Sequence, residues 1–243
     1  CYTEAMKAYL INLGRSPERL AAADAALRTA GVAYERVEGV DGRALDAQAL
    51  RAAANRVRFR LIYGAWPSAG TVGCALSHQA VYRRMLAKDV PLALVFEDDI
   101  AIPDPEAFRR TVEAIAQDND PAVPTAWRLE HRPTDPPMAG EGFWPAKPGV
   151  CGACAYAVNL AGARLLARVN RAPIVALADD WPRFGRLGLR ALTVWPAPCR
   201  ESGADSTIGK AARPRPPWRV ALWRLIRALG RAIDALLIPL TGR

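Results

Sequence analysis

The 243-residue chain is poor in the residues and motifs that mark several common protein classes. Five cysteines are too few for a disulfide scaffold, and their odd number leaves at least one unpaired, so we expect a reducing compartment. Nothing near Cys1 resembles a signal peptide. The sequence has no G-x-G-x-x-G and no G-x-x-x-x-G-K-[ST] pattern, so a nucleotide would have to be held without these loops. The absence of a G-x-S-x-G elbow argues against a hydrolase triad.

The net charge of +9 is concentrated at one end of the chain. Residues 213–243 hold seven arginines and one acid, a net of +6, which leaves +3 for the first 212 residues. The remainder has no stripe of interleaved aromatic and basic residues, so we expect no nucleic-acid partner. With 51% hydrophobic and 23% charged residues, the composition is that of a globular enzyme or binding domain.

The order of apolar runs and helix signals predicts an α/β domain over residues 5–210. Residues 7–13 read as a strand, residues 16–30 as a helix capped by Ser16, and residues 32–37 as a second strand. Such units build a mostly parallel sheet with helices on its faces. We expect further helices at 73–88, 105–116 and 160–170, further strands at 91–96, 126–130, 152–158 and 189–194, and loop over most of 118–148.

Residues 211–243 differ in character from the rest. A proline-rich linker precedes Trp218–Leu240, where arginines fall on one helical face and Trp, Leu and Ile cover the remainder. The segment carries too many charges to span a bilayer comfortably, and its composition suits a helix lying on an anionic membrane surface. A helix that packs on the domain or on a partner is the alternative.

Three consecutive acids, Glu97, Asp98 and Asp99, follow the apolar run of residues 91–96 directly. In open α/β sheets ligands bind at the carboxyl ends of strands, and adjacent carboxylates repel one another unless a cation joins them. Oxygen ligands favour Mg²⁺ or Mn²⁺, which could also hold a diphosphate. The alternative is a strand ending in solvated acids, one of which caps the next helix.

Ser77 and His78 form the second candidate feature. Neighbours on a helix point in different directions, so they cannot form a nucleophile–base pair. His78 could contact a phosphate at a helix N-terminus, or it could be a hydrogen-bonded structural residue. The pair Cys151 and Cys154 lacks the second pair that a zinc site needs, and we interpret the cysteines as small buried residues.

Two further pairs carry weaker signals. Asp179 and Asp180 precede Trp181-Pro182, where a carboxylate could act as a general base or simply cap a helix. Arg15 and Arg19 flank the first strand–helix junction, a favourable place for an anion.

Taken in order, five stretches resemble glycosyltransferase family 25, the lipopolysaccharide-type transferases. They extend from residue 9 to residue 167: YLINLGRSPERL (9–20), YERVEGVDGR (34–43), GCALSHQAVYRRML (73–86), LALVFEDDI (92–100) and GACAYAVNLAGARLLA (152–167). The resemblance implies a GT-A-like fold and inverting transfer of a sugar, often galactose, from a UDP-sugar to a glycan acceptor. Gly14 and Thr71 stand where members commonly have acids, which puts the substrate more in doubt than the activity.

The resemblance also implies roles for individual residues. Asp98 and Asp99 would hold Mn²⁺ or Mg²⁺, and Glu97 belongs to the same motif. The matching nucleotide- and substrate-binding residues are Asn12, Arg15, Arg19, Ser77 and His78, and Asp179 or Asp180 would be the base. We expect a lipid-linked or oligosaccharide acceptor and a cytoplasmic enzyme attached peripherally to the inner membrane. A non-catalytic sugar-nucleotide-binding relative and a membrane adaptor are the alternative classes.

Overall fold

The computed structural model describes residues 6–132, 135 and 138–203. The elements in this part of the chain are β1 (Lys7–Asn12), α1 (Pro17–Thr29), β2 (Glu35–Glu38), α2 (Ala47–Ala53), α3 (Arg56–Tyr63), α4 (Ala69–Ala87), β3 (Leu92–Glu97), β4 (Ile100–Ala101), α5 (Pro105–Asp118), β5 (Thr125–Arg128), β6 (Gly142–Pro145), β7 (Ala155–Asn159), α6 (Leu160–Val169), α7 (Trp181–Arg186), β8 (Arg190–Trp195) and β9 (Arg200–Glu201). The predicted α/β class is confirmed.

A sheet in the order β2-β1-β3-β7-β5-β8-β6 organises the domain. The pairs β1–β2, β1–β3 and β5–β8 are parallel, whereas β7 pairs antiparallel with both β3 and β5, and β6 antiparallel with β8. Strands β1, β2, β3, β5 and β8 therefore run the same way, which confirms the predicted mostly parallel sheet. The reversed strand β7 enters the sheet at the edge where β3 ends.

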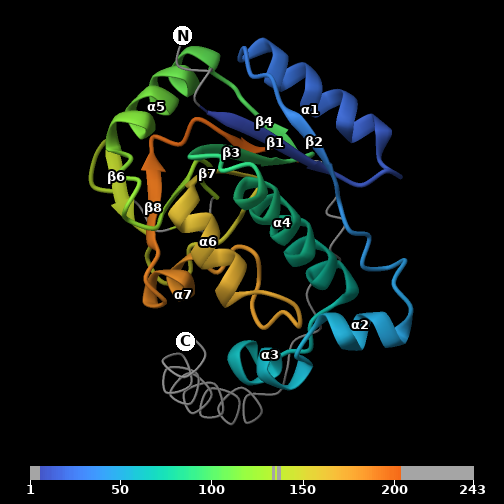
Figure 1. Cartoon of the computed structure of the whole chain (residues 1–243). Helices are drawn as coiled ribbons and strands as arrows, with labels where there is room; N and C mark the ends of the chain where they lie inside the picture. The colour runs from blue at the N-terminus through green and yellow to red at the C-terminus, as the bar shows by residue number, and fades with distance from the viewer. Residues whose placement is uncertain (1–5, 133–134, 136–137, 204–243) are drawn as a thin grey trace.

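Both faces of the sheet are buried by helices (Figure 1). Helices α1 and α5 cover one face, and α4 and α6 cover the other. Along β1, Ala8 and Leu10 belong to the core of the first face, and Tyr9 and Ile11 to that of the second. Two-sided burial explains why β1 and β3 read as continuous apolar runs without alternation.

Helix α4 begins four residues earlier than its apolar pattern predicts. Its N-cap is Ser68, whose side chain accepts a hydrogen bond from the backbone N–H of Thr71. Gly70 and Gly73 lie near the start of the helix, so the apolar spacing does not reveal where the helix begins. Ser16 is the N-cap residue of α1, which confirms the predicted helix start, but its side chain makes no capping hydrogen bond there.

The loop after β2 crosses the first turns of α4 at backbone contact distance. A Cβ at Gly42 would lie 1.8 Å from the carbonyl oxygen of Ala69, and one at Gly73 would lie 2.4 Å from that of Val40. Ser77 links the loop to the helix. Its hydroxyl accepts a hydrogen bond from the N–H of Val40 and donates one to the Gly73 carbonyl, both at 2.8 Å. The glycines and Ser77 thus bring residues 39–43 against α4.

Four elements, β4, β6, β9 and α7, were not predicted, and residues 46–70, expected to combine one short helix with an irregular stretch, contain two helices, α2 and α3. Strand β6 lies within the stretch expected to be loop, and α7 follows Asp180 directly. Most other predicted elements are confirmed with shifted ends; residues 32–37, for example, become a strand only at Glu35. The predicted domain boundary at residue 210 and the predicted helix over residues 218–240 lie outside the described residues. Within the described part, no helix is long and apolar enough to cross a membrane.

Candidate active site

The candidate site lies at the sheet edge where β1, β2 and β3 end. Register places Ile11 beside Glu97 and Asn12 beside Glu38, so the ends of these strands are level. A pocket at this edge, called here the edge pocket, is lined by residues 39–43, by one side of α4, by Arg15 and Arg19, and by Glu97–Asp99. The fold therefore brings together the acids, Arg15, Arg19, Ser77 and His78 that sequence analysis selected from separate segments.

Asp98 is held by side chains from β1 and α1. Asn12 donates from Nδ2 to Asp98 Oδ2 at 2.7 Å, and Arg19 forms an ion pair with Asp98 Oδ1. Asn12 is buried and also accepts from Arg36 Nε at 3.1 Å. Asn12 thus orients Asp98 rather than lining the pocket, and both oxygens of Asp98 already have partners.

Asp99 has an oxygen that fits a cation. Arg19 lies 3.1 Å from Asp99 Oδ2, whereas the buried Oδ1 has no hydrogen-bond partner within the described part. Burial, followed by the charge of Glu97, raises the pKa of Asp99 to about 7. A divalent cation would offset this burial and repulsion. The oxygen donors suit Mn²⁺ or Mg²⁺. Asp99 fits a metal ion best, because one of its oxygens has no partner among the described residues. Asp98 could coordinate the same ion only with an oxygen that already has a partner.

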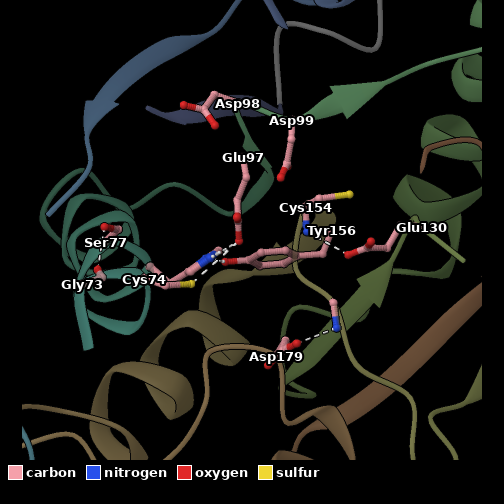
Figure 2. A network of polar contacts seen from close by, with 12 residues as sticks. Gly73, Cys74, Ser77, Glu97, Asp98, Asp99, Glu130, Cys154, Tyr156 and Asp179 are labelled. Carbon is pink, nitrogen blue, oxygen red and sulfur yellow. Dashed lines mark hydrogen bonds and ion pairs between the residues drawn. The ribbon is translucent and has the colours of Figure 1, made fainter. Parts of the chain in front are cut away.

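His78 lies in the middle of α4, so the expectation of a histidine at a helix N-terminus is wrong. The side chain is 2% exposed; Nε2 lies 3.0 Å from Glu97 Oε1, and Nδ1 lies 2.8 Å from the hydroxyl of Tyr156. Tyr156 continues the chain to the hydroxyl of Tyr82 at 3.0 Å. Figure 2 shows Glu97 and Asp99 pointing to one side of the strand end and Asp98 to the other. Glu97 therefore contacts a histidine–tyrosine network while it also lines the edge pocket.

The other predicted pocket residues have defined partners. Arg15 forms a 2.6 Å ion pair with Asp41 at the pocket rim, where its side chain is 45% exposed. Ser77 is bonded to backbone and not to His78, as the exclusion of a nucleophile–base pair requires. The four described cysteines are free; Cys154 and Cys199 are buried as predicted, but Cys74 and Cys151 are half-buried, and Cys1 is outside the described residues.

Asp179 and Asp180 lie beside a second pocket, and their environments differ. Asp180 is the N-cap of α7, accepting from the N–H of Arg183 at 3.2 Å and from the hydroxyl of Tyr63 at 2.5 Å. Asp179 accepts a hydrogen bond from the N–H of Gly152 at 2.7 Å. Burial raises the pKa of Asp179, and the charge of Glu97 adds to the shift. Of the two, Asp179 has the environment of a base.

Sequence analysis missed Glu130, a completely buried acid two residues beyond β5. Its Oε1 accepts from the N–H of Cys154 at 2.7 Å, and its Oε2 has no hydrogen-bond partner within the described part. Gly152 makes room for it, because a Cβ there would lie 2.7 Å from Glu130 Oε1. A sequence signal for Glu130 was present, because it is the acid at the end of the run TAWRLE (125–130), just as Glu97 is the acid at the end of LALVFE (92–97).

Replacing Glu130 by Gln is expected to flatten the pH dependence of the unfolding free energy. Burial raises the pKa of Glu130 from 4.5 to about 7, so between these values the folded state holds a proton that the unfolded chain has lost. The stability that this residue contributes is therefore greatest at low pH and falls as pH rises toward 7. The loss from pH 5 to pH 8 is about 2 to 3 kcal/mol.

Urea unfolding of both proteins at pH 5 and pH 8 measures this difference. The wild type should lose more stability between the two values than Glu130→Gln, whose amide oxygen still accepts from Cys154. Glu113→Gln, at an exposed position on α5, should behave like the wild type. Equal losses in the wild type and Glu130→Gln would contradict the assignment.

Comparisons with known proteins show the family. A model of glycosyltransferase family 25 (LPS biosynthesis protein) matches residues 5–180, and the chain belongs to that family. An inactive glycosyltransferase 25 family member 3 of Mus musculus is 30% identical over 117 residues, covering 45% of this chain and 19% of the relative. Procollagen galactosyltransferase 2 of Mus musculus is 32% identical over 123 residues, covering 47% and 18%. This chain thus spans about a fifth of the length of these relatives.

Among solved structures, the chain is similar to a glycosyltransferase involved in the glycosylation of the major capsid of PBCV-1. The identity is 10% and the TM-score 0.39, with 92% of this chain and 99% of that chain covered.

Proposed function

We propose that this domain transfers a hexose, galactose first among the candidates, from a UDP-sugar to a hydroxyl of a lipopolysaccharide-type glycan, with metal assistance and inversion. The observation that carries the proposal is the edge pocket itself, where three arginines and four carboxylates line the carboxyl ends of β1–β3. Family membership supports glycosyl transfer, and the similarity to a procollagen galactosyltransferase supports galactose.

The edge pocket is assigned to the donor. Arg15 and Arg19 offer guanidinium groups to a diphosphate, and residues 39–43 supply backbone polar groups beside them. A Mn²⁺ or Mg²⁺ ion held by Asp99, with Asp98 beside it, would neutralise the negative charge that develops on the departing UDP. Asn12 fixes Asp98, and Asp98 and Asp99 together fix Arg19, so the charged groups are oriented before the donor arrives.

The second pocket is assigned to the acceptor. Its lining mixes apolar side chains with a few polar groups, among them Tyr63, Asp179 and Arg186, which suits a sugar ring. Asp179 would take the proton of the attacking hydroxyl, because a carboxylate with a raised pKa is a stronger base than an ordinary aspartate. Glu97 influences the pKa of Asp179, so the two pockets are close enough to be electrostatically linked.

The experiment that tests the function is UDP release from a panel of UDP-sugars with Mn²⁺, without it and with EDTA. We expect metal-dependent turnover of one sugar, by transfer or by slow hydrolysis. Metal-dependent UDP binding without turnover of any sugar would favour a non-catalytic sugar-nucleotide-binding protein, the alternative that the inactive relatives suggest. Absence of both UDP and metal binding would refute the donor-site assignment.

The proposed location is the cytoplasmic face of the inner membrane, near a lipid-linked acceptor. Support comes only from the arginine-rich sequence of residues 213–243, since each arginine near an anionic surface contributes about 1 kcal/mol. Binding to anionic vesicles without any donor binding would instead favour the membrane adaptor.

A further inference from the structure

Three side chains on the floor of the edge pocket form a ligand set different from the oxygen donors at Asp98 and Asp99. Cys74 and His78 are four residues apart on α4, so both face the same side of the helix, and Glu97 reaches them from the end of β3. The Cys74 sulfur, the imidazole nitrogen and the carboxylate oxygen all lie within 4.8 Å of one another.

We infer that Cys74, His78 and Glu97 bind a thiophilic divalent cation, Zn²⁺ above all, as three ligands of a tetrahedral site. A thiolate, an imidazole and a carboxylate are ligands that Zn²⁺ accepts and that Mg²⁺ and Mn²⁺ do not prefer as a set. The thiolate and the carboxylate together balance the charge of the ion. Because all three residues line the edge pocket, the fourth position is accessible from solvent.

Distances at the site are close to those that coordination needs. Glu97 Oε1 lies 3.0 Å from His78 Nε2 and 3.9 Å from Cys74 Sγ. Ligands about 2.0 to 2.3 Å from a tetrahedral ion lie about 3.3 to 3.8 Å apart, so small side-chain movements would suffice. Two ligands come from one helix and the third from the end of β3.

The surroundings of His78 support metal binding. A zinc-bound histidine commonly uses its second nitrogen to donate to an oxygen, which fixes the ring and its tautomer. Nδ1 of His78 lies 2.8 Å from the Tyr156 hydroxyl, and that hydroxyl lies 3.0 Å from that of Tyr82. With the metal on Nε2, Nδ1–H donates to Tyr156, and Tyr156 donates to Tyr82. The proton of the Cys74 thiol leaves to solvent as the metal–sulfur bond forms.

The charge around Cys74 also favours a cation. Burial above all raises the pKa of the thiol, and the negative charges of Glu97, Asp179 and Asp99 near the sulfur raise it further. A cation beside the sulfur would offset this accumulation of negative charge.

Co²⁺ titration of the reduced, metal-free full chain tests the site. The expected result is a thiolate-to-metal charge-transfer band that saturates at one ion per chain, is displaced by Zn²⁺ and persists in excess Mn²⁺. Cys74→Ser should abolish the band, whereas Cys151→Ser, a second half-buried cysteine, should retain it. Glu97→Gln should weaken binding by roughly 10- to 100-fold or more while the band remains reachable at high Co²⁺.

The test does not depend on sugar transfer, so its failure is separate from failure of the proposed function. A wild-type protein without a thiolate band would overturn the inference, and so would a band that survives Cys74→Ser or disappears in Cys151→Ser. If Cys74→Ser does not fold, the wild-type titration and Glu97→Gln still decide. In the wild type, Zn²⁺ should also raise the melting temperature, as ligand binding to the folded state requires.

Discussion

Asp99→Asn is expected to reduce metal-dependent sugar transfer by about 10³-fold while the domain stays folded. The neutral amide keeps the size of the side chain and an oxygen for Arg19, but it removes the charge that would hold the ion. A loss of about 4 kcal/mol in transition-state stabilisation corresponds to this factor. Because Asp99 is half-buried beside Glu97 and Asp98, removal of its charge should not destabilise the fold at neutral pH.

Initial rates of UDP release at saturating donor, with Mn²⁺ varied, measure the effect. Asp104→Asn is the matched control, since Asp104 caps α5 outside the pocket and asparagine caps equally well. Asp104→Asn should retain wild-type rates. If Asp99→Asn keeps full Mn²⁺-dependent transfer, the assignment of the metal to Asp99 is wrong.

Asp179→Asn is expected to lower kcat by about 10²- to 10⁴-fold with little change in the KM for the donor. General base catalysis contributes a factor of this size, and asparagine cannot accept the acceptor's proton. The amide oxygen still accepts from the N–H of Gly152, so the loop around residue 152 should keep its place.

Asp180→Asn separates the base from its neighbour. Asparagine preserves the N-cap of α7, and its amide can still hydrogen-bond with the hydroxyl of Tyr63. We expect kcat within a few-fold of the wild type. Values of kcat against pH for the three proteins complete the measurement, because loss of the base should remove the acidic limb that the wild type shows. A larger loss in Asp180→Asn than in Asp179→Asn would reverse the assignment.

Much of the candidate site could be predicted because the acids carry a local signal. An apolar run that ends in Glu97-Asp98-Asp99 places carboxylates at a strand end whatever the rest of the fold does, and β3 does end at Glu97. Glu130 lies two residues beyond β5, and a single acid there has an ordinary interpretation as a solvated residue. Only the arrival of the reversed strand β7, which brings Cys154 against it, makes Glu130 buried.

Cys74 shows the limit of spacing arguments most clearly. No other cysteine lies at a metal-binding spacing from it, so sequence analysis set it aside. The relevant partner was a histidine four residues further on, and both residues lie within the predicted helix as well as within α4. The third ligand comes from Glu97, which the pairing of β3 with β1 places beside α4.

The sequence by itself determined the alternation of strands and helices, the family, and the identity of the charged residues at the strand ends, because these depend on periodicity and local motifs. Only the tertiary structure decided the partners of these residues. Arg19 forms ion pairs with Asp98 and Asp99, Tyr156 is hydrogen-bonded to His78, and the N–H of Gly152 donates to Asp179. These contacts join segments far apart in the chain. Burial and the charges of such neighbours, and not residue type, set the pKa of a carboxylate, so Asp179 and Asp180 are alike in sequence and different in the fold.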